Sequence, residues 1–356
     1  MPGRQGRMKV ATIVGARPQF IKAAAVSRAI AARDDLVEML IHTGQHFDHD
    51  MSNIFFRELG IPRPGYELGL GGGTHGQMTG RMLEAIEAIL LDERPTAVIV
   101  YGDTNSTIAG ALAAAKLRVP VVHVEGGLRS FNRAMPEEIN RVMTDHLSDL
   151  LLCPTATAVA NLAREGITAG VHAIGDVMYD ATVFAAETAR SCSDILARLG
   201  LEESGYAIAT LHRAENVDDP ARLAVVLEYL HDESRARPVV FPMHPRTRAA
   251  VDRMRRDLSG LRVCPPVGYL DMHRLLQSAA VVYTDSGGLQ KEAYFHRVPC
   301  VTLREETEWV ETVAAGWNRL WRNPEYLPPR EIEDYGDGHA AERAVDLIVE
   351  RYRTAV

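Results

Sequence analysis

Cysteine pairs, long apolar runs and an excess of positive charge are all missing from this 356-residue sequence. No apolar run approaches the roughly 20 residues that cross a bilayer, and no apolar signal segment follows the basic start MPGRQGR. We therefore expect a soluble, cytoplasmic protein without a membrane partner. The cysteines form no CxxC pair, which argues against a disulfide framework and favours small buried side chains in a reducing compartment. They are Cys153, Cys192, Cys264 and Cys300.

The charge balance narrows the range of partners. A formal net charge of −8 argues against non-specific binding of nucleic acid, which needs a basic surface to neutralise phosphates. It still allows a small anionic ligand in a local basic pocket. Metal chemistry is not expected either, because the histidines show no HExxH or paired CxxC spacing. The histidines concerned are His42, His46, His49 and the His123 of His123-x-Glu125.

What the sequence does contain is a regular alternation of short apolar runs and helix-like segments. This pattern is typical of α/β folds whose parallel sheets are covered on both faces. The alternation restarts after residue 176, so we predict two Rossmann-like, doubly wound domains, residues 8–176 and 177–338, with a cleft between them. An amphipathic helix is predicted at 339–354. The apolar runs span 9–14, 37–43, 97–103, 119–125 and 150–155, and then 206–212, 238–244, 261–266, 279–285 and 298–304.

Polar side chains gather at the ends of these runs in both domains. Any one of them is more often a helix cap or a surface group than a functional residue. Ligands of open α/β sheets, however, bind at the carboxyl ends of the strands, so the shared position of these residues favours a functional site. They are Arg17, Lys22, Asp103, Glu125 and Arg129 in the first domain, and His212, Arg213, Glu215, His244, Arg246, Asp285 and Ser286 in the second.

Acid–base chemistry is the reaction type that these residues favour. Asp103, Glu125, Glu137 and Glu138 supply carboxylates, and His212 supplies an imidazole. Carboxylates that are crowded or desolvated have raised pKa values and can exchange protons near neutrality. Glu137 has an alternative interpretation, because acidic residues are also favoured in the first turn of a helix.

The segment GGGTHG (71–76) formally fits the G-x-G-x-x-G pattern of dinucleotide-binding folds. That pattern requires a buried strand directly before it, and the preceding PGYELGL is broken by glycine. A nicotinamide cofactor is therefore not expected, and a flexible loop over the cleft is the better interpretation.

The stretch TDSGGLQKEA (284–293) could be a nucleophile turn or an anion seat. A nucleophile elbow needs G-x-S-x-G, but Thr284 stands two residues before Ser286. A strand followed by Ser-Gly-Gly and a helix would instead present backbone N–H groups and a helix dipole to an anion. A plain N-cap by Ser286 remains the alternative.

Seven motifs together resemble the non-hydrolysing UDP-N-acetylglucosamine 2-epimerase family. They occur in the family's order, and the resemblance runs from about residue 9 to about residue 320. They are GARPQFIK, GDTNST, HVEGGLRS, MPEEINR, LHRAEN, HP and TDSGGLQKEA.

The resemblance implies a fold, a reaction and an assembly. The fold is GT-B, with two Rossmann-like domains, a UDP-sugar in the cleft and the C-terminal helix (339–356) packing back on the first domain. The reaction inverts C2 of a UDP-2-acetamido sugar by elimination of UDP to a glycal and re-addition on the other face, and it provides precursors of cell-surface polysaccharides. It needs no nicotinamide and no metal, and the family is usually homodimeric.

The resemblance also implies roles for individual residues. Asp103, Glu125 and Glu137 would be the catalytic carboxylates, and His212 would stabilise the departing phosphate. The substrate and its UDP would be bound by Arg17, Lys22, His244, Ser286, Gly287, Gly288 and Glu292, with Met272 on the uracil side.

Some positions depart from the simplest members of the family. Trp309 replaces an arginine that contacts the nucleotide side, and Met272 stands where an aromatic residue is common. With the loop SFNR (130–133), these features resemble the branch that acts on UDP-2,3-diacetamido-2,3-dideoxyglucuronate. Arg133 is then a candidate to bind the uronate carboxylate, and an exposed loop charge is the alternative. Gln45 and His46 match part of an allosteric segment, whose neighbouring residues differ.

Other functions remain open. A hydrolysing 2-epimerase would release UDP, a GT-B glycosyltransferase would pass the sugar to an acceptor, and a UDP-sugar sensor would bind without turnover. Three carboxylates argue against the transferase, because glycosyl transfer requires no deprotonation at C2.

Overall fold

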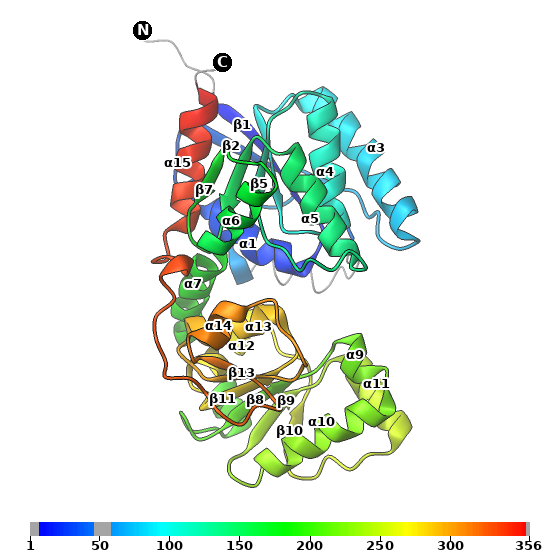
Figure 1. The fold of residues 1–356 in the computed structure, drawn as a ribbon, viewed down its shortest axis with the longest axis vertical. Coiled ribbons are helices and arrows are strands. Elements are labelled where there is room, and N and C mark those ends of the chain that lie inside the picture. Colours follow the sequence, from blue (N-terminus) through cyan, green and yellow to red (C-terminus); the bar gives the residue numbers. More distant parts are fainter. Residues whose placement is uncertain (1–6, 46–57, 354–356) are drawn as a thin grey trace. The chain divides into compact units, whose positions relative to one another are not determined.

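The computed structural model describes residues 7–45 and 58–353. Contacts between Cα atoms divide the chain into two compact units, and each is described by itself. The N-terminal unit comprises the described parts of 1–181 and 334–356, and the C-terminal unit comprises 182–333 (Figure 1). Helix α7 (Val177–Cys192) runs through the division, which lies five residues after the boundary that the sequence predicts at 176.

A parallel seven-stranded sheet forms the centre of the N-terminal unit. Its strand order is β3-β2-β1-β4-β5-β6-β7, which changes direction between β1 and β4 as doubly wound folds do. The strands are β1 (Met8–Val14), β2 (Leu36–His42), β3 (Tyr66–Glu67), β4 (Ala97–Tyr101), β5 (Val121–Val124), β6 (Leu150–Cys153) and β7 (Val171–Ala173).

Helices cover both faces of this sheet. Helices α3, α4 and α5 pack in sequence on one another, and α1 packs against α15, the last helix of the chain (Figure 1). Every residue of β4 is buried, as expected for a central strand covered on both faces. The helices are α1 (Arg17–Ala31), α3 (His75–Glu93), α4 (Asn105–Lys116), α5 (Pro136–Leu147), α6 (Ala156–Arg164) and α15 (Ala340–Tyr352).

The C-terminal unit repeats the same plan with six parallel strands in the order β10-β9-β8-β11-β12-β13. The strands are β8 (Ala207–Thr210), β9 (Val239–Pro242), β10 (Leu261–Cys264), β11 (Val281–Thr284), β12 (Cys300–Thr302) and β13 (Asn318–Leu320). The helices are α8 (Ile195–Leu199), α9 (Ala214–Val217), α10 (Pro220–Glu233), α11 (Pro245–Met254), α12 (Tyr269–Gln277), α13 (Gly287–Phe295) and α14 (Val310–Ala314). A 3-10 turn, Glu333–Tyr335, follows where the chain passes from this unit back to the N-terminal unit.

The predicted fold class, two doubly wound α/β units with parallel sheets, is confirmed. The predicted helix at 339–354 is α15, whose apolar side is buried within the N-terminal unit. None of the helices in the described residues is both long and apolar enough to cross a membrane.

Candidate functional site

Each unit carries a cluster of polar side chains at the carboxyl ends of its central strands. In the N-terminal unit the cluster surrounds the ends of β1, β4 and β5. In the C-terminal unit it surrounds the ends of β8 and β11. The sequence predicts both locations, and the contacts within each cluster indicate what its members can do.

Lys22 and Glu125 form a buried ion pair in the N-terminal cluster. The Lys22 Nζ contacts Glu125 Oε2, and the two side chains are 10% and 8% exposed. Gly102, which follows β4, lies beside this pair, and a Cβ at that position would come within 3.4 Å of both charged atoms. Glu125 itself has a φ of 72°, a left-handed conformation that non-glycine residues rarely adopt. The strained backbone therefore turns the Glu125 carboxylate towards the Lys22 cation at the carboxyl ends of the strands.

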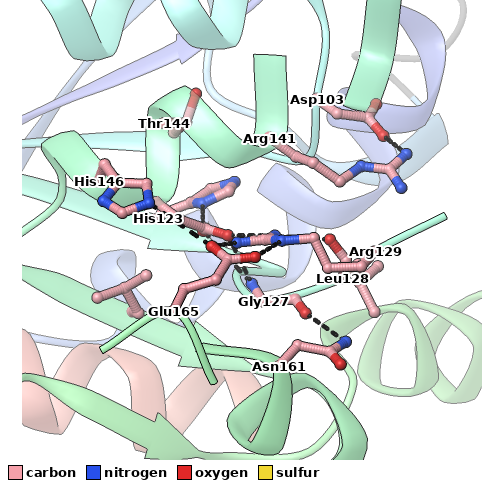
Figure 2. Close-up of polar contacts among 12 residues, drawn as sticks. Asp103, His123, Gly127, Leu128, Arg129, Arg141, Thr144, His146, Asn161 and Glu165 are labelled. Carbon is pink, nitrogen blue, oxygen red and sulfur yellow. Dashed lines mark hydrogen bonds and ion pairs between the residues drawn. The ribbon is translucent and has the colours of Figure 1, made fainter. Parts of the chain in front are cut away.

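Asp103 is the more accessible carboxylate of this cluster, with a side chain that is 33% exposed. Its Oδ2 accepts a hydrogen bond of 2.5 Å from Arg141 Nη2, and its backbone carbonyl accepts one of 2.9 Å from Asn140 Nδ2. Figure 2 shows the Arg141 side chain reaching Asp103 from α5. Helix α5 therefore fixes both the backbone and the side chain of Asp103, and leaves its other oxygen for a ligand.

The same arginine connects Asp103 to the loop before α5. Arg141 Nη1 donates to Glu138 Oε2 at 3.1 Å, and Glu138 accepts hydrogen bonds from the Ser130 N–H, the Ser130 hydroxyl and the Phe131 N–H at 2.9, 2.9 and 3.0 Å. Burial raises the pKa of Glu138, but these hydrogen bonds and the Arg141 charge outweigh it and lower the pKa overall. Glu138 is therefore ionised and holds residues 130–131 in place by hydrogen bonds. Its lowered pKa makes it unsuited to acid–base catalysis.

Glu137 and Arg133 lie on the exposed side of this clamped segment. Glu137 is in the first turn of α5, and no side chain caps that helix. Both residues are thus available to a ligand, and neither has a hydrogen bond or ion pair within the described residues.

A buried charge network supports the turn that carries Glu125. Asp145, on α5, accepts hydrogen bonds from His123 Nδ1 at 2.7 Å, from the Gly127 N–H at 3.1 Å and from Arg129 Nη1 at 2.6 Å. Arg129 also forms two bonds of 2.7 Å to Glu165, as Figure 2 shows. The other His123 nitrogen lies 2.8 Å from the Gly102 carbonyl oxygen. Burial raises the pKa of Asp145, but the charges and hydrogen bonds of His123 and Arg129 outweigh it and lower that pKa overall.

Asp285 organises the C-terminal cluster from a fully buried position after β11. It accepts hydrogen bonds from the backbone N–H groups of His212 and Arg213, at 3.1 and 3.0 Å, and from Asn216 Nδ2 at 3.2 Å. The His212 ring also lies beside it, with Nδ1 3.3 Å from Asp285 Oδ1 and 43% of the side chain exposed. Asp285 thereby fixes the turn after β8 and orients the imidazole.

Helix α13 begins beside this turn. The Ser286 hydroxyl accepts a hydrogen bond from the Leu289 N–H at 3.4 Å, so Ser286 is the N-cap of α13. A Cβ on Gly287 would overlap Glu308 Oε1 and lie 3.1 Å from Trp309 Nε1. Only glycine fits there, and its lack of a side chain lets Glu308 and Trp309 approach the positive end of the helix.

Glu292, on the same helix, is backed by two histidines. It is 6% exposed, and its Oε1 lies 3.9 Å from His273 Nε2. The opposite His273 nitrogen, Nδ1, lies 2.8 Å from His296 Nε2. Burial, together with the charge of Arg190, lowers the pKa of His296 to about 4. His296 is therefore a neutral partner at physiological pH.

The buried His296 gives the C-terminal unit a defined pH dependence. Its folded pKa of about 4 lies below the value of about 6.5 in an unfolded chain, so only the unfolded chain binds a proton between these values. The free energy of unfolding is therefore complete above pH 6.5, and we expect it to fall by roughly 2–3 kcal/mol as the pH drops from 6.5 to 4. The variant His296→Gln should lose this part of the decline.

The measurement is urea unfolding followed by tryptophan fluorescence, because all three tryptophans belong to the C-terminal unit. His231→Gln, at an exposed position of α10, is the matched control and should keep the decline of the parent protein. Equal pH slopes in the parent and in His296→Gln would contradict the prediction.

The other predicted site residues have varied surroundings. Arg17 is exposed at the start of α1, and His244 is exposed as the N-cap of α11, accepting a hydrogen bond from the Arg246 N–H at 3.2 Å. Met272 is half-buried on α12 and packs against the core of the C-terminal unit. Gln45 accepts hydrogen bonds from the Ser106 N–H and hydroxyl at 3.0 and 2.9 Å, whereas His46 lies outside the described residues.

Two important side chains were absent from the sequence-based set: Arg141 and Asp145. A signal for Arg141 existed in MPEEINR, since residues three or four apart share one face of a helix and Arg141 stands three residues after Glu138. Asp145 gave no such signal, because its partners His123 and Arg129 are distant in sequence and meet it only through the packing of α5 on β5.

Comparisons with known proteins agree on one family. A family model described as UDP-N-acetylglucosamine 2-epimerase matches residues 28–349. A UDP-2,3-diacetamido-2,3-dideoxy-D-glucuronate 2-epimerase of Pseudomonas aeruginosa is 55% identical over 318 residues, 88% of each chain. A UDP-N-acetylglucosamine 2-epimerase homolog of Methanococcus maripaludis is 49% identical, over 96% of this chain and 99% of that protein. The crystal structure of Methanocaldococcus jannaschii UDP-GlcNAc 2-epimerase in complex with UDP-GlcNAc and UDP has a TM-score of 0.84 and 40% identity, over 96% of this chain and 100% of that one.

Proposed function

Because the chain belongs to the UDP-N-acetylglucosamine 2-epimerase family, we propose that it inverts C2 of a UDP-2-acetamido sugar, with the UDP-2,3-diacetamido-2,3-dideoxyglucuronate and mannuronate pair as its substrates. The observation that carries the choice of substrate is the 55% identity to the Pseudomonas aeruginosa enzyme of that name. The pair UDP-GlcNAc and UDP-ManNAc is the second candidate, favoured by the archaeal relatives.

The reaction is an elimination followed by an addition. A base removes the C2 proton, the C1–O bond breaks, and UDP departs with the electron pair, leaving a glycal. UDP then adds back at C1 while an acid delivers a proton to the opposite face of C2. The C2 proton is only weakly acidic, so the step needs a positioned base and good stabilisation of the leaving diphosphate at the same time.

The N-terminal cluster supplies the acid–base groups in this proposal. Asp103, Glu125 and Glu137 are the carboxylates that exchange protons with C2. Lys22 neutralises Glu125 and, with Arg17, binds the sugar nucleotide. Support comes from the accessibility of Asp103 and Glu137, and from the buried pair that holds Glu125 beside a cation.

The C-terminal cluster holds the leaving group. His212, oriented by Asp285, stabilises the departing phosphate, and the start of α13 at Ser286, Gly287 and Gly288 holds the diphosphate. Glu292 binds the ribose hydroxyls, and His244 and Met272 complete the nucleotide site. Support comes from the start of α13, where Ser286 is the N-cap and Gly287 the first residue, and from the buried histidines behind Glu292.

Proton NMR in deuterated water tests the function directly. The purified protein, given either UDP-sugar pair and no acceptor, should exchange the C2 proton for deuterium and produce both epimers. We expect the exchange to be faster with the diacetamido uronate. Release of free sugar and UDP would indicate the hydrolysing enzyme, and binding without exchange of any UDP-sugar would indicate a sensor or a glycosyltransferase.

Arg133 gives a separate test of the substrate. It is exposed on the loop that Glu138 holds in place, and we propose that it binds the uronate carboxylate. The variant Arg133→Ala should lower kcat/KM for the diacetamido uronate by about tenfold or more, the effect of one lost charge-assisted hydrogen bond. Its kcat/KM for UDP-GlcNAc should change little.

The matched control is Arg118→Ala. It removes an exposed arginine before β5, at the amino ends of the strands and so on the side of the sheet opposite to the candidate site. Steady-state kinetics of both variants on both substrates provide the comparison. An equal loss on the two substrates would contradict a role for Arg133 in recognising the uronate.

The family context also favours a cytoplasmic homodimer that supplies precursors of cell-surface polysaccharide. Light scattering on a sizing column should give twice the chain mass of 39.2 kDa. A single-chain mass at all concentrations would contradict the dimer.

A further inference from the structure

Trp309 carries a buried hydrogen-bond donor whose partner is missing. The residue stands just before α14 and is 8% exposed, and its indole Nε1 is buried without a hydrogen-bond partner among residues 7–45 and 58–353. A buried donor left unpaired costs about 1–3 kcal/mol, so such groups in native proteins call for an explanation. A ligand that accepts this hydrogen bond would provide one.

The unpaired N–H faces the start of α13. The Trp309 Nε1 lies 3.1 Å from the point where a Cβ on Gly287 would stand. Gly287 is the first residue of α13, and the first N–H groups of a helix have no partner within the helix and attract anions. Two independent features, the helix terminus and the indole, therefore present donors to the same place.

The charges around this place are balanced. Glu308 also approaches Gly287, but its carboxylate is bound by Arg304 Nη1 at 2.8 Å and approached by Arg213 Nη2 at 3.4 Å. Arg304 in turn pairs with Glu215 at 2.7 Å. Two guanidinium groups thus offset two carboxylates, and the carboxylate of Glu308 does not leave a net negative charge against an incoming anion.

Lys291 lies over the Trp309 ring and makes the indole N–H a stronger hydrogen-bond donor. Its Nζ lies 4.0 Å from the centroid of the Trp309 ring, and the lysine is fully buried. A cation over an aromatic face is held by the electron density of the ring. It draws that density away from the indole nitrogen, which makes the N–H a better donor towards an anion.

We propose that the Trp309 indole N–H donates a hydrogen bond to a phosphate oxygen of the nucleotide diphosphate at the start of α13. This inference rests on the proposed function, which places UDP there. Trp309 then recognises the leaving group.

NMR on the full-length protein, with 15N in its tryptophan side chains, observes this hydrogen bond directly. The three tryptophans, at positions 309, 317 and 321, give three indole N–H signals. The signal that is lost in Trp309→Phe identifies Trp309. In the parent protein this signal should move downfield when UDP is added and should stay in place with uridine, which has no phosphate.

Binding calorimetry gives a second, independent measurement. Trp309→Phe keeps an aromatic side chain near Lys291 and removes the N–H together with part of the indole, so its Kd for UDP should rise about tenfold while its Kd for uridine stays the same. Trp317→Phe removes the same atoms and is the matched control, because the Trp317 indole donates to the Arg330 carbonyl at 2.9 Å and its ring packs on Tyr294, near the C-terminal end of α13. It should bind UDP as the parent protein does.

The outcomes separate the two proposals. If the parent protein binds no UDP, the proposed function fails and this inference fails with it. If the parent binds UDP but the Trp309 signal does not move, or Trp309→Phe binds UDP equally well, only the role of Trp309 is refuted. The NMR result on the parent protein stands even if Trp309→Phe does not fold.

Discussion

Replacing Asp103 by asparagine is expected to lower kcat by about 10³-fold and to leave the affinity for UDP nearly unchanged, since general acid–base groups contribute about 10²–10⁴-fold. Asparagine keeps the size of the side chain and can still accept the hydrogen bond from Arg141. It cannot take or return a proton. The chemical step is therefore lost, whereas the C-terminal unit, where UDP is proposed to bind, is untouched.

Deuterium exchange at C2 and calorimetry with UDP, on the same preparation, provide the measurement. Asp149→Asn is the matched control. Asp149 accepts a hydrogen bond from the Val121 N–H at 3.1 Å. It stands just before β6, so it lies at the amino ends of the strands, opposite to Asp103. Its kcat should stay within about twofold of the parent value, because it is far from the acid–base groups. Retention of most of the exchange in Asp103→Asn would exclude Asp103 as an acid–base group.

Replacing Asp145 by asparagine should destabilise the N-terminal unit by roughly 3–5 kcal/mol, the usual result of removing one partner from a buried ion pair. Asp145 accepts from His123, from the Gly127 N–H and from Arg129, all through a side chain with no exposed surface. Asparagine carries no charge, and its NH₂ group would face a donor on one side. The turn after β5 would lose its anchor.

Two spectroscopic signals distinguish the units in this experiment. All three tryptophans belong to the C-terminal unit, so urea unfolding of the N-terminal unit is seen by circular dichroism and not by tryptophan fluorescence. Asp145→Asn should shift the first signal and leave the second in place. Glu165→Gln is the control, because Glu165 binds the same guanidinium but is 28% exposed, and it should cost about 1 kcal/mol or less. Equal losses in the free energy of unfolding for Asp145→Asn and Glu165→Gln would contradict the idea that burial makes the Asp145 contacts more important.

The central strands were predictable because burial on both faces makes them continuously apolar. Each apolar run found in the sequence overlaps a strand of the structure. The runs predicted at 97–103 and 119–125 extend too far, since β4 ends at Tyr101 and β5 at Val124. The backbone leaves the sheet there with positive φ at Gly102 and Glu125, and hydrophobicity contains no information on that turn.

The strands missed in the sequence are edge strands. β3, β7 and β13 have two or three residues each and lie at the outer edges of their sheets. Edge strands are paired on one side only and need few apolar residues, so a short piece such as Tyr66–Glu67 produces no periodic signal. Its pairing with β2 is decided by tertiary structure.

Site residues were predictable from the sequence where they belong to one motif at the end of a strand. They were not predictable where they meet only through the packing of separate elements. Asp103, Glu125 and the start of α13 follow strands and were found in this way. The indole of Trp309 meets Gly287 only because α14 packs against α13. Sequence alone could not show that the indole N–H of Trp309 lacks a partner among the described residues.

The position of α15 has a consequence for biosynthesis. This helix packs on α1, yet the whole C-terminal unit, residues 182–333, lies between them in the chain. The ribosome therefore completes the C-terminal unit before it makes the helix that covers the buried residues of α1. Until α15 is made, the side of α1 that it covers stays exposed in the nascent chain. Chaperones that recognise exposed apolar faces could bind there.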